Sequence, residues 1–393
     1  MNPRLLLTMK KCVRTILRVF RIFPVKNNRV VFISYEGQRY SCNPKYVSEY
    51  LEKAYPSRWE IIWVLDHPGK YPQLQQRGIR MVKNDSLAFV KAVATAKAIV
   101  SNNGLALYLP SLRESQCFIN TWHGGGAYKR VLNDWKKEPI EREINTMIAA
   151  QTTYFLSGCH RFTEVMAEAA SMPLDKMREW GMPRNDVLFE EHPEVVRRVK
   201  EAFGLPENCR IVLYAPTYRG GTTTSVSAME QNTPLDATRC LESLRQRFDG
   251  EWFFLYRDHY FNQEQQRHPR ENVLDASTYD DMQELLCAAD VLITDYSSSI
   301  WDYSFTGKPC LLYAPDRKNY QSERDFYTPI EEWPFPLAED NDQLMEKICS
   351  FDPEEYDRAV RQHHDQLGSC ETGHAAQTVG DYLYRFCLEG AKK

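Results

Sequence analysis

Several signatures that would each identify a class of protein are missing from the sequence. It contains no Walker A loop, no GxGxxG fingerprint and no HExxH motif, which excludes ATP-type phosphoryl transfer by that loop and argues against dinucleotide and metal chemistry. The nearest approach to a metal cluster, His363-His364-Asp365, consists of adjacent residues, whose side chains point apart on a helix. We therefore predict that the protein uses no cofactor and no metal.

The 11 cysteines include no CxxC pair, so neither a disulfide framework nor a zinc ribbon fits, and we expect reduced thiols in a cytosolic chain. No window approaches the roughly 20 apolar residues of a membrane span. The net charge of −4 argues against a nucleic-acid partner, because general nucleic-acid binders are usually basic.

Acidic residues are also absent from residues 1–35, which carry eight Lys and Arg side chains. Apolar residues recur between these charges at helical spacing, from Leu6 to Phe20. A signal peptide fits poorly, because Arg14 and Arg18 interrupt the apolar stretch. We predict a basic amphipathic helix over residues 1–28 that lies on an anionic membrane surface. The alternative is a helix that packs on its own domain with its charges in water.

Length and composition predict two soluble domains. A chain of 393 residues exceeds one ordinary domain, and 43% hydrophobic with 26% charged residues is typical of a globular protein rather than a disordered or fibrous one. Short apolar runs alternate with helical stretches, which predicts parallel sheets covered by helices on both faces. The expected strands are 30–34, 61–65, 98–101, 117–120, 154–157, 211–215, 252–256, 273–274, 291–294 and 310–313.

A Pro-, Glu- and Arg-rich break at 181–204 separates the two halves, and residues 220–236 are expected to form a mobile loop. We expect a domain over 29–190, a second over 191–370, and a C-terminal helix over 371–393 that could pack back on the first domain.

The strongest local signal is Thr294-Asp295-Tyr296-Ser297-Ser298-Ser299, where a buried strand ends and three serines open a helix. Backbone N–H groups and hydroxyls would converge there on one point, which favours a phosphate. The alternative is that Ser297 is only a helix N-cap.

A second signal is the histidine in Thr121-Trp122-His123-Gly124-Gly125-Gly126, placed where a strand leaves the sheet. A strand-end histidine can act as a general base toward a hydroxyl group, and the glycines would let the backbone approach a ligand. A structural histidine is the alternative reading.

Two further strand ends carry polar side chains. Arg257 and His259 lie two residues apart and could share one phosphate, while Thr217 and Arg219 follow another strand. Each could instead be a surface turn. Taken together, these strand-end residues indicate a ligand site, because ligands of α/β sheets bind at the carboxyl ends of the strands.

With these residues in place, the chain resembles the CDP-glycerol glycerophosphotransferase family, the teichoic-acid polymerases and primases of Gram-positive bacteria. The resemblance covers most of residues 30–330. It is carried by Tyr40–Tyr46, Thr121–Gly124, Gly181–Asp186, Tyr214–Arg219, Thr294–Asp302, Lys308-Pro309, Tyr313, Asp316 and Arg324–Tyr327.

The resemblance implies a GT-B fold, with two Rossmann-like domains facing each other across a cleft. It also implies transfer of glycerol phosphate from CDP-glycerol to a polyprenyl-linked saccharide acceptor, with release of CMP, at the cytoplasmic face of the membrane. His123 and His259 match the family's two functional histidines. The substrate-binding residues expected are Trp122, Gly124, Arg184, Asn185, Thr217, Arg219, Arg257, Asp295, Ser297, Ser298, Asp302 and Arg324.

Alternatives stay open within the same fold. The donor could be CDP-ribitol, or the protein could be a glycosyltransferase that uses a nucleotide sugar. A non-catalytic membrane-associated binding protein is the alternative of another class. One departure concerns the acceptor: the family often has Gly-Thr-Pro after the histidine, where this chain has Gly124-Gly125-Gly126.

Overall fold

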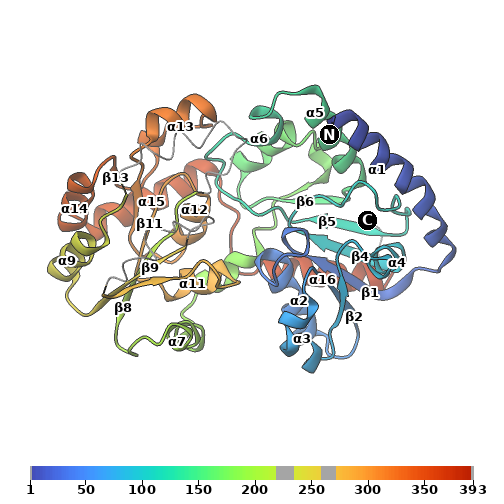
Figure 1. The fold of residues 1–393 in the computed structure, drawn as a ribbon, viewed down its shortest axis with the longest axis horizontal. Helices are drawn as coiled ribbons and strands as arrows, with labels where there is room; N and C mark the ends of the chain where they lie inside the picture. Colours follow the sequence, from blue (N-terminus) through green and yellow to red (C-terminus); the bar gives the residue numbers. More distant parts are fainter. Residues whose placement is uncertain (1, 218–233, 258–270, 391–393) are drawn as a thin grey trace. The chain divides into compact units, whose positions relative to one another are not determined.

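The computed structural model describes residues 2–217, 234–257 and 271–390, and the chain forms two compact units (Figure 1). The first unit contains the chain up to Gly124, Val131–Asp186 and everything from Ser369 onward. The second contains Gly125–Arg130 and Val187–Gly368. Sequence analysis had placed Gly125–Arg130 in the first domain, and the difference arises because this short segment packs against elements of the second unit.

The first unit is built on a seven-stranded sheet in which every pairing is parallel. Its order is β3 (Arg80–Lys83), β2 (Glu60–Leu65), β1 (Lys26–Ile33), β4 (Ala96–Ser101), β5 (Cys117–Asn120), β6 (Tyr154–Leu156) and β7 (Met177–Arg178). The helices are α1 (Pro3–Leu17), α2 (Cys42–Ala54), α3 (Pro72–Gln76), α4 (Leu87–Thr95), α5 (Pro139–Gln151), α6 (His160–Ala169) and α16 (Ala375–Leu388).

Strand β1 shows why both faces of this sheet are covered. Its side chains alternate between two hydrophobic clusters: Val30 and Phe32 join one, Val31 and Ile33 the other. All four are buried, as expected for a central strand of a parallel sheet. Residues of α16 complete one cluster and residues of α4 the other.

The C-terminal helix α16 packs closely on α2 within the first unit. A Cβ atom on Gly380 would lie 2.3 Å from the ring of Tyr50, so the helices can approach this closely only because residue 380 has no side chain. The hydroxyl groups of Tyr50 and Tyr55 both donate to the carboxylate of Asp381, at 2.8 and 2.7 Å.

The second unit has a six-stranded parallel sheet. Its order is β10 (Val273–Asp275), β9 (Trp252–Tyr256), β8 (Arg210–Tyr214), β11 (Val291–Thr294), β12 (Cys310–Tyr313) and β13 (Leu337–Ala338). The helices described are α7 (Pro193–Ala202), α9 (Ala237–Phe248), α11 (Met282–Ala288), α12 (Ser299–Ser304), α13 (Arg317–Glu323), α14 (Asn341–Cys349) and α15 (Pro353–Leu367).

The predicted fold class, two α/β units with parallel sheets, is confirmed, and every expected strand is present. Sequence analysis missed β3, β7 and β13, which are short edge strands of two to four residues with incomplete burial. The break expected at 181–204 is wrong in part, because α7 lies there, with Val195 and Val199 buried one turn apart. Most of the loop expected at 220–236 lies outside the described residues.

Each sheet has one point where the strand order reverses. In the first unit this point lies between β1 and β4, and in the second between β8 and β11. Ligands of open α/β sheets bind beyond the carboxyl ends of the strands at such a switch point. The loops that follow these four strands, and their neighbours, are therefore the places to look for functional side chains.

Candidate functional site

In the first unit, His123 lies three residues beyond the end of β5, after a strained residue. Trp122 has a φ of 52°, in the left-handed region that a tryptophan rarely adopts. Such a conformation costs of order 1–3 kcal/mol and persists only where the surroundings hold it. One restraint is local, since the side chain of Asn120 accepts the N–H of Trp122 at 3.0 Å.

Asn43, near the start of α2, supplies the other restraint. Its amide nitrogen donates to the carbonyl oxygens of Thr121 and Trp122, at 3.2 and 3.0 Å. Its amide oxygen accepts the backbone N–H of Arg184 at 3.0 Å. Asn43 is fully buried, so these bonds are shielded from water and fix the turn that carries His123.

Arg184 and Asn185, both expected to bind substrate, are buried beneath this turn with 3% and 0% exposure. The amide nitrogen of Asn185 donates to the carboxylate of Glu371 at 3.0 Å, and the same carboxylate accepts the N–H of Met182 at 2.9 Å. Sequence reasoning missed the part played by Glu371, because nothing in its local pattern points to residues almost 190 positions earlier.

The imidazole of His123 is held in one tautomer. Its Nδ1 lies 2.8 Å from the carbonyl oxygen of Asn102, which follows β4 at the switch point. A carbonyl oxygen only accepts, so Nδ1 carries the proton and Nε2 of the neutral ring carries the lone pair. The ring stacks on Trp122 at 4.4 Å and lies 5.7 Å from the ring of Tyr35. Asn102 was not foreseen, although its place directly after a buried strand is a usable signal.

In the second unit, Asp295 connects the loops after β11 and β8. One carboxylate oxygen accepts the N–H groups of Thr217 and Tyr296, at 2.7 and 2.5 Å. The neighbouring Thr294 hydroxyl donates to the carbonyl oxygen of Ala215 at 2.6 Å. Asp295 is 1% exposed, so the structure brings Thr217 and Asp295 together but uses this carboxylate to shape the loop.

The serines that precede α12 are partly exposed and near one another. The Ser297 hydroxyl oxygen accepts the N–H of Ser299 at 3.3 Å and lies 3.0 Å from the Ser299 hydroxyl. The N-cap residue is Ser298 rather than Ser297, and its side chain makes no capping bond. Asp302, expected to bind substrate, is instead 3% exposed and accepts from the Gln283 side chain at 3.0 Å.

Arg257 and Arg324, two further expected residues, each donate to a backbone carbonyl. Arg257 follows β9, and its guanidinium donates to the carbonyl oxygen of Tyr279 at 2.7 Å. Nε of Arg324 donates to the carbonyl oxygen of Arg130 at 3.0 Å. His259 and Arg219 lie outside the described residues.

The segment Gly125–Arg130, directly after Gly124, is tied into the second unit by backbone pairing. Lys129 forms an antiparallel bridge with Phe326, and the N–H of Tyr327 donates to the carbonyl oxygen of Tyr128 at 2.8 Å. The family-like motif Arg324–Tyr327 therefore holds the chain that follows His123.

These motifs belong to a known family. The family model described as CDP-Glycerol:Poly(glycerophosphate) glycerophosphotransferase matches residues 15–385. The chain belongs to this family. The resemblance described under Sequence analysis is thereby confirmed, and the protein is a transferase of the teichoic-acid glycerol-phosphate class.

Relatives and solved structures agree with this assignment. The teichoic acid poly(glycerol phosphate) polymerase of Bacillus spizizenii is 29% identical over 94% of this chain and 95% of its own length. The polymerase of the same name from Staphylococcus epidermidis is 30% identical over 92% of this chain, which spans only 51% of that protein. The solved structure of the wall teichoic acid polymerase TagF has a TM-score of 0.80 at 28% identity and covers 98% of this chain and 96% of its own. The fold is accordingly GT-B-like.

Proposed function

We propose that this member of the family transfers glycerol phosphate from CDP-glycerol to a hydroxyl group of a membrane-lipid-linked saccharide and releases CMP. The family assignment supports glycerophosphate transfer in teichoic-acid synthesis. The acceptor and the roles of individual residues are our proposal. The observation that carries it is the contact between Nδ1 of His123 and Asn102, because it leaves the lone pair on Nε2.

In the proposed reaction, Nε2 of His123 takes the proton of the acceptor hydroxyl, whose oxygen attacks the β-phosphorus of CDP-glycerol. A new phosphorus–oxygen bond forms, the bond from that phosphorus to the bridging oxygen breaks, and CMP leaves with the bridging oxygen. General-base help of this kind is worth roughly 10²–10⁴ in rate. The bonds from Asn43 hold the strained turn at Trp122 and so keep the imidazole in place before substrate arrives.

Groups of the second unit are proposed to bind the diphosphate. Thr217, Arg257, Ser297 and Ser298 follow three neighbouring strands of its sheet, and all four are partly exposed. Hydroxyl groups and a guanidinium stabilise charge on a transferring phosphoryl group and on its leaving group. We retain His259 and Arg219 in this set on the strength of their motifs.

Five other expected residues receive a different proposed role. Arg184, Asn185, Asp295, Asp302 and Arg324 each hydrogen-bond another part of their own unit, and all but Arg324 are at most 3% exposed. We propose that they position the loops that carry His123, Thr217 and the serines, and that they act on substrate through those loops.

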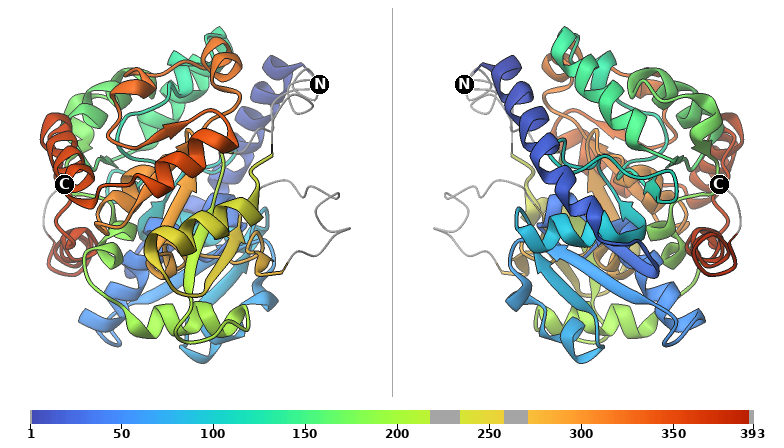
Figure 2. Two further views of the ribbon diagram at one scale, coloured as in Figure 1. Left: turned by 90° about the vertical axis from the view of Figure 1, so that its left-hand side faces the viewer. Right: turned by 90° about the vertical axis from the view of Figure 1, so that its right-hand side faces the viewer.

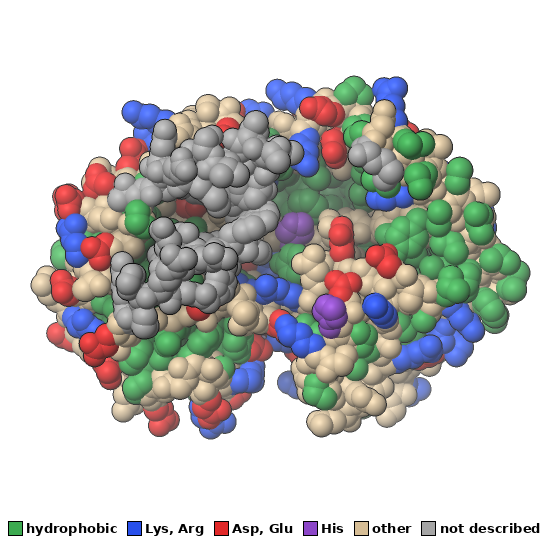
Figure 3. Space-filling model, in the orientation of Figure 1, with side chains coloured by type: hydrophobic (Ala, Val, Ile, Leu, Met, Phe, Trp, Pro, Cys, Tyr) green, Lys and Arg blue, Asp and Glu red, His purple; other side chains and the backbone are tan. Residues whose placement is uncertain are grey.

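The N-terminal helix is proposed to hold the protein on an anionic membrane surface. Helix α1 runs along the outside of the first unit (Figure 2). Leu7 is buried there, and Lys11 forms an ion pair with Glu143 at 2.7 Å. Seven of the eleven exposed large hydrophobic side chains in the described part of the chain belong to α1 and the turn after it (Figure 3). These seven are Leu5, Leu6, Met9, Val13, Ile16, Val19 and Ile22. No helix among the described residues is long and apolar enough to span a bilayer.

The spacing of these exposed apolar side chains favours contact with a membrane surface rather than with water. Leu6, Met9, Val13 and Ile16 recur every three or four residues along one side of α1, and together with Val19 and Ile22 of the following turn we call them the apolar stripe. Such a stripe flanked by cations is typical of a helix that lies in the membrane interface.

The experiment that tests the reaction is incubation with CDP-glycerol, CDP-ribitol or UDP-sugars and a lipid-linked acceptor. Release of CMP with CDP-glycerol supports the proposal. Release with CDP-ribitol alone would establish the ribitol alternative, and release of UDP a glycosyltransferase. Binding of CDP-glycerol without turnover in any mixture would support the non-catalytic alternative.

A further inference from the structure

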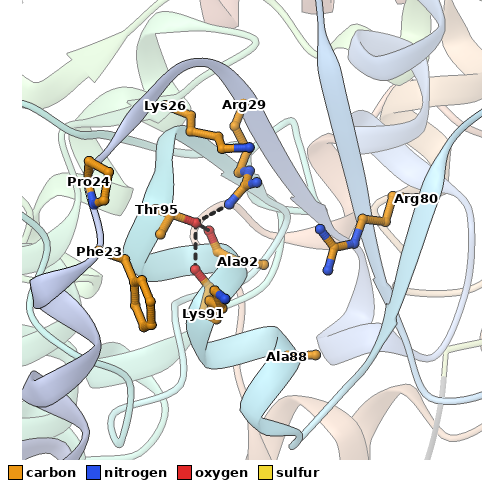
Figure 4. A pocket seen from close by; sticks show the side chains of 9 residues that line it. All are labelled: Phe23, Pro24, Lys26, Arg29, Arg80, Ala88, Lys91, Ala92 and Thr95. Atoms are coloured by element: carbon orange, nitrogen blue, oxygen red, sulfur yellow. Dashed lines mark hydrogen bonds between the residues drawn. The ribbon is translucent and has the colours of Figure 1, made fainter.

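A pocket lies near the amino ends of strands of the first sheet, whereas His123 lies beyond the carboxyl end of β5. It has a volume of about 370 Å³ and is lined by Phe23, Pro24, Lys26, Arg29, Arg80, Ala88, Lys91, Ala92 and Thr95 (Figure 4). Lys26, Arg29 and Arg80 stand at or near the amino ends of β1 and β3, and Thr95 ends α4. His123 follows the carboxyl end of β5, so this pocket is not the candidate site described above.

The pocket is strongly cationic. Four of its nine lining residues are Lys or Arg, and the ion pairs found there all use one carboxylate, that of Glu60. Glu60 lies 2.7 Å from Arg29, 3.3 Å from Lys26 and 3.8 Å from Arg80. A single negative charge cannot neutralise three cations, and the remaining positive potential favours an anion.

Arg29 gives the pocket a fixed charge. Its side chain is nine-tenths buried, with 5% of the residue exposed, and its guanidinium donates to Thr95 and to Glu60. Within the described part of the chain its Nε has no hydrogen-bond partner. Figure 4 shows the side chains of Arg29 and Arg80 entering the pocket from different strands. A buried guanidinium with incomplete compensation is costly unless an anion is near.

The fourth cation, Lys91, and the apolar residues Phe23 and Pro24 place this positive charge next to an apolar surface. Nζ of Lys91 lies 4.4 Å from the centre of the Phe23 ring. Phe23 and Pro24 directly follow Ile22, which is 75% exposed and ends the apolar stripe of α1 and its following turn. An anion bound here would thus lie beside a surface suited to hydrocarbon.

We propose that this pocket binds the phosphate group of an anionic membrane phospholipid whose acyl chains lie along the stripe from Leu6 to Ile22. A glycerophospholipid joins a phosphate to apolar chains, as the pocket joins four cations to an apolar rim. The proposal rests on the membrane docking under Proposed function, and it does not depend on the transfer reaction.

Vesicle co-sedimentation of the full chain tests the charge requirement. The R80Q/K91Q variant removes two exposed pocket cations, and K53Q/R58Q removes two exposed cations elsewhere on the same unit. At about 1 kcal/mol per cation near anionic lipid, we expect R80Q/K91Q to weaken binding to phosphatidylcholine vesicles containing phosphatidylglycerol by about 10-fold or more. Binding of K53Q/R58Q should fall less than about 3-fold. Equal losses of vesicle binding in the two variants would show that the pocket is not a specific lipid-binding site.

Soluble probes identify the source of the phosphate. Short-chain dibutyryl phosphatidylglycerol should bind the wild-type chain, lose that binding in R80Q/K91Q and keep it in K53Q/R58Q. Inorganic phosphate should bind at least 10-fold more weakly. Phosphate that binds as tightly as the lipid would overturn the lipid assignment, and failure of both probes would overturn the site.

Failure of the pocket can be separated from failure of the two proposals before it. The I16S/I22S variant tests docking through the stripe, and it should lose binding to pure phosphatidylcholine vesicles, to which R80Q/K91Q should bind as the wild type does. CMP release with a water-soluble acceptor should be unchanged in R80Q/K91Q. If turnover there falls with vesicle binding, the lining cations serve the reaction and the lipid site is wrong.

Discussion

The indole ring of Trp301 occupies the space that a side chain on Gly125 would need. A Cβ atom at Gly125 would lie 2.4 Å from Cδ1 of Trp301, which is fully buried in α12. Gly126 adds a second requirement, because its φ is 74° and a Cβ there would lie 2.2 Å from the Tyr128 ring. The glycines after His123 are therefore needed for packing, and a Gly-Thr-Pro sequence would not fit beside this tryptophan.

We predict that this packing helps to position His123, which precedes Gly125 by two residues in the chain. The G125A variant should lose at least 10-fold in CMP release and about 1–3 kcal/mol in stability, as overpacked cores do. The double variant G125A/W301F, which shortens the ring, should recover part of both. Steady-state kinetics and urea unfolding measure these effects. A G125A protein with wild-type turnover would show that the contact has no functional role.

Replacing His123 by alanine should lower turnover by about 10²–10⁴, because the proposed general base is removed. Binding of CDP-glycerol should persist, since the groups proposed to hold the diphosphate belong to the second unit. Single-turnover kinetics and calorimetric titration measure the two quantities separately. Unchanged turnover in H123A would remove the imidazole from the reaction.

Asn43 should matter for rate more than for donor affinity. The N43A variant loses the bonds to Thr121 and Trp122 and releases the strained turn before His123. We expect kcat to fall about 10-fold or more with KM for CDP-glycerol changed less than about 3-fold, since buried polar networks fix geometry. The exposed N27A variant serves as control. A loss confined to KM would contradict this role.

The serines before α12 should show the opposite kinetic pattern. In S297A/S298A, the loss of two hydroxyl groups proposed to contact the diphosphate should raise KM for CDP-glycerol about 10-fold or more, at roughly 1 kcal/mol per hydrogen bond. S322A, on the exposed part of α13, should behave as the wild type. If the double variant keeps its KM, these serines only shape the helix start.

Acid should destabilise the second unit first. Burial lowers the pKa of His363 and of His364 to about 4, and each ring accepts or donates one hydrogen bond, with Tyr128 and Ser304 respectively. The unfolded chain takes up these protons near pH 6.5 and the folded unit only near pH 4, so stability is lost as pH falls through this window, by about 2–3 kcal/mol per histidine.

In the first unit, Asp186 has the opposite effect on the pH dependence of stability. Burial raises the pKa of Asp186 to about 6, so its folded form binds a proton before the unfolded chain does, and acidification from pH 6 toward 4 stabilises that unit. Hydrogen exchange at pH 7 and pH 5 should show faster opening at pH 5 around α12 and α15. H364Q, which cannot titrate, should reduce the effect. Equal protection at both pH values would contradict the assignment.

Much of the fold can be predicted from local patterns in the amino-acid sequence. Fully apolar runs such as 30–33 and 291–293 specify buried parallel strands, because both faces of such strands meet helices. Polar residues that follow buried strands, such as Thr217 after β8 and Asp295 after β11, could be located because parallel strands present their carboxyl ends at the same end of the sheet. The family motifs then indicated the chemistry.

Tertiary structure alone decided what several of those residues do. Arg184 meets Asn43 across 141 positions and Asn185 meets Glu371 across 186, and no local pattern specifies such partners. The same holds for Gly125 and Trp301, where a missing side chain has meaning only once the indole that fills its place is known. Periodicity and local propensity act over a few residues, and they determined the elements. Packing and buried hydrogen bonds act between residues far apart in the chain, and they determined which polar residues hold the loops in place.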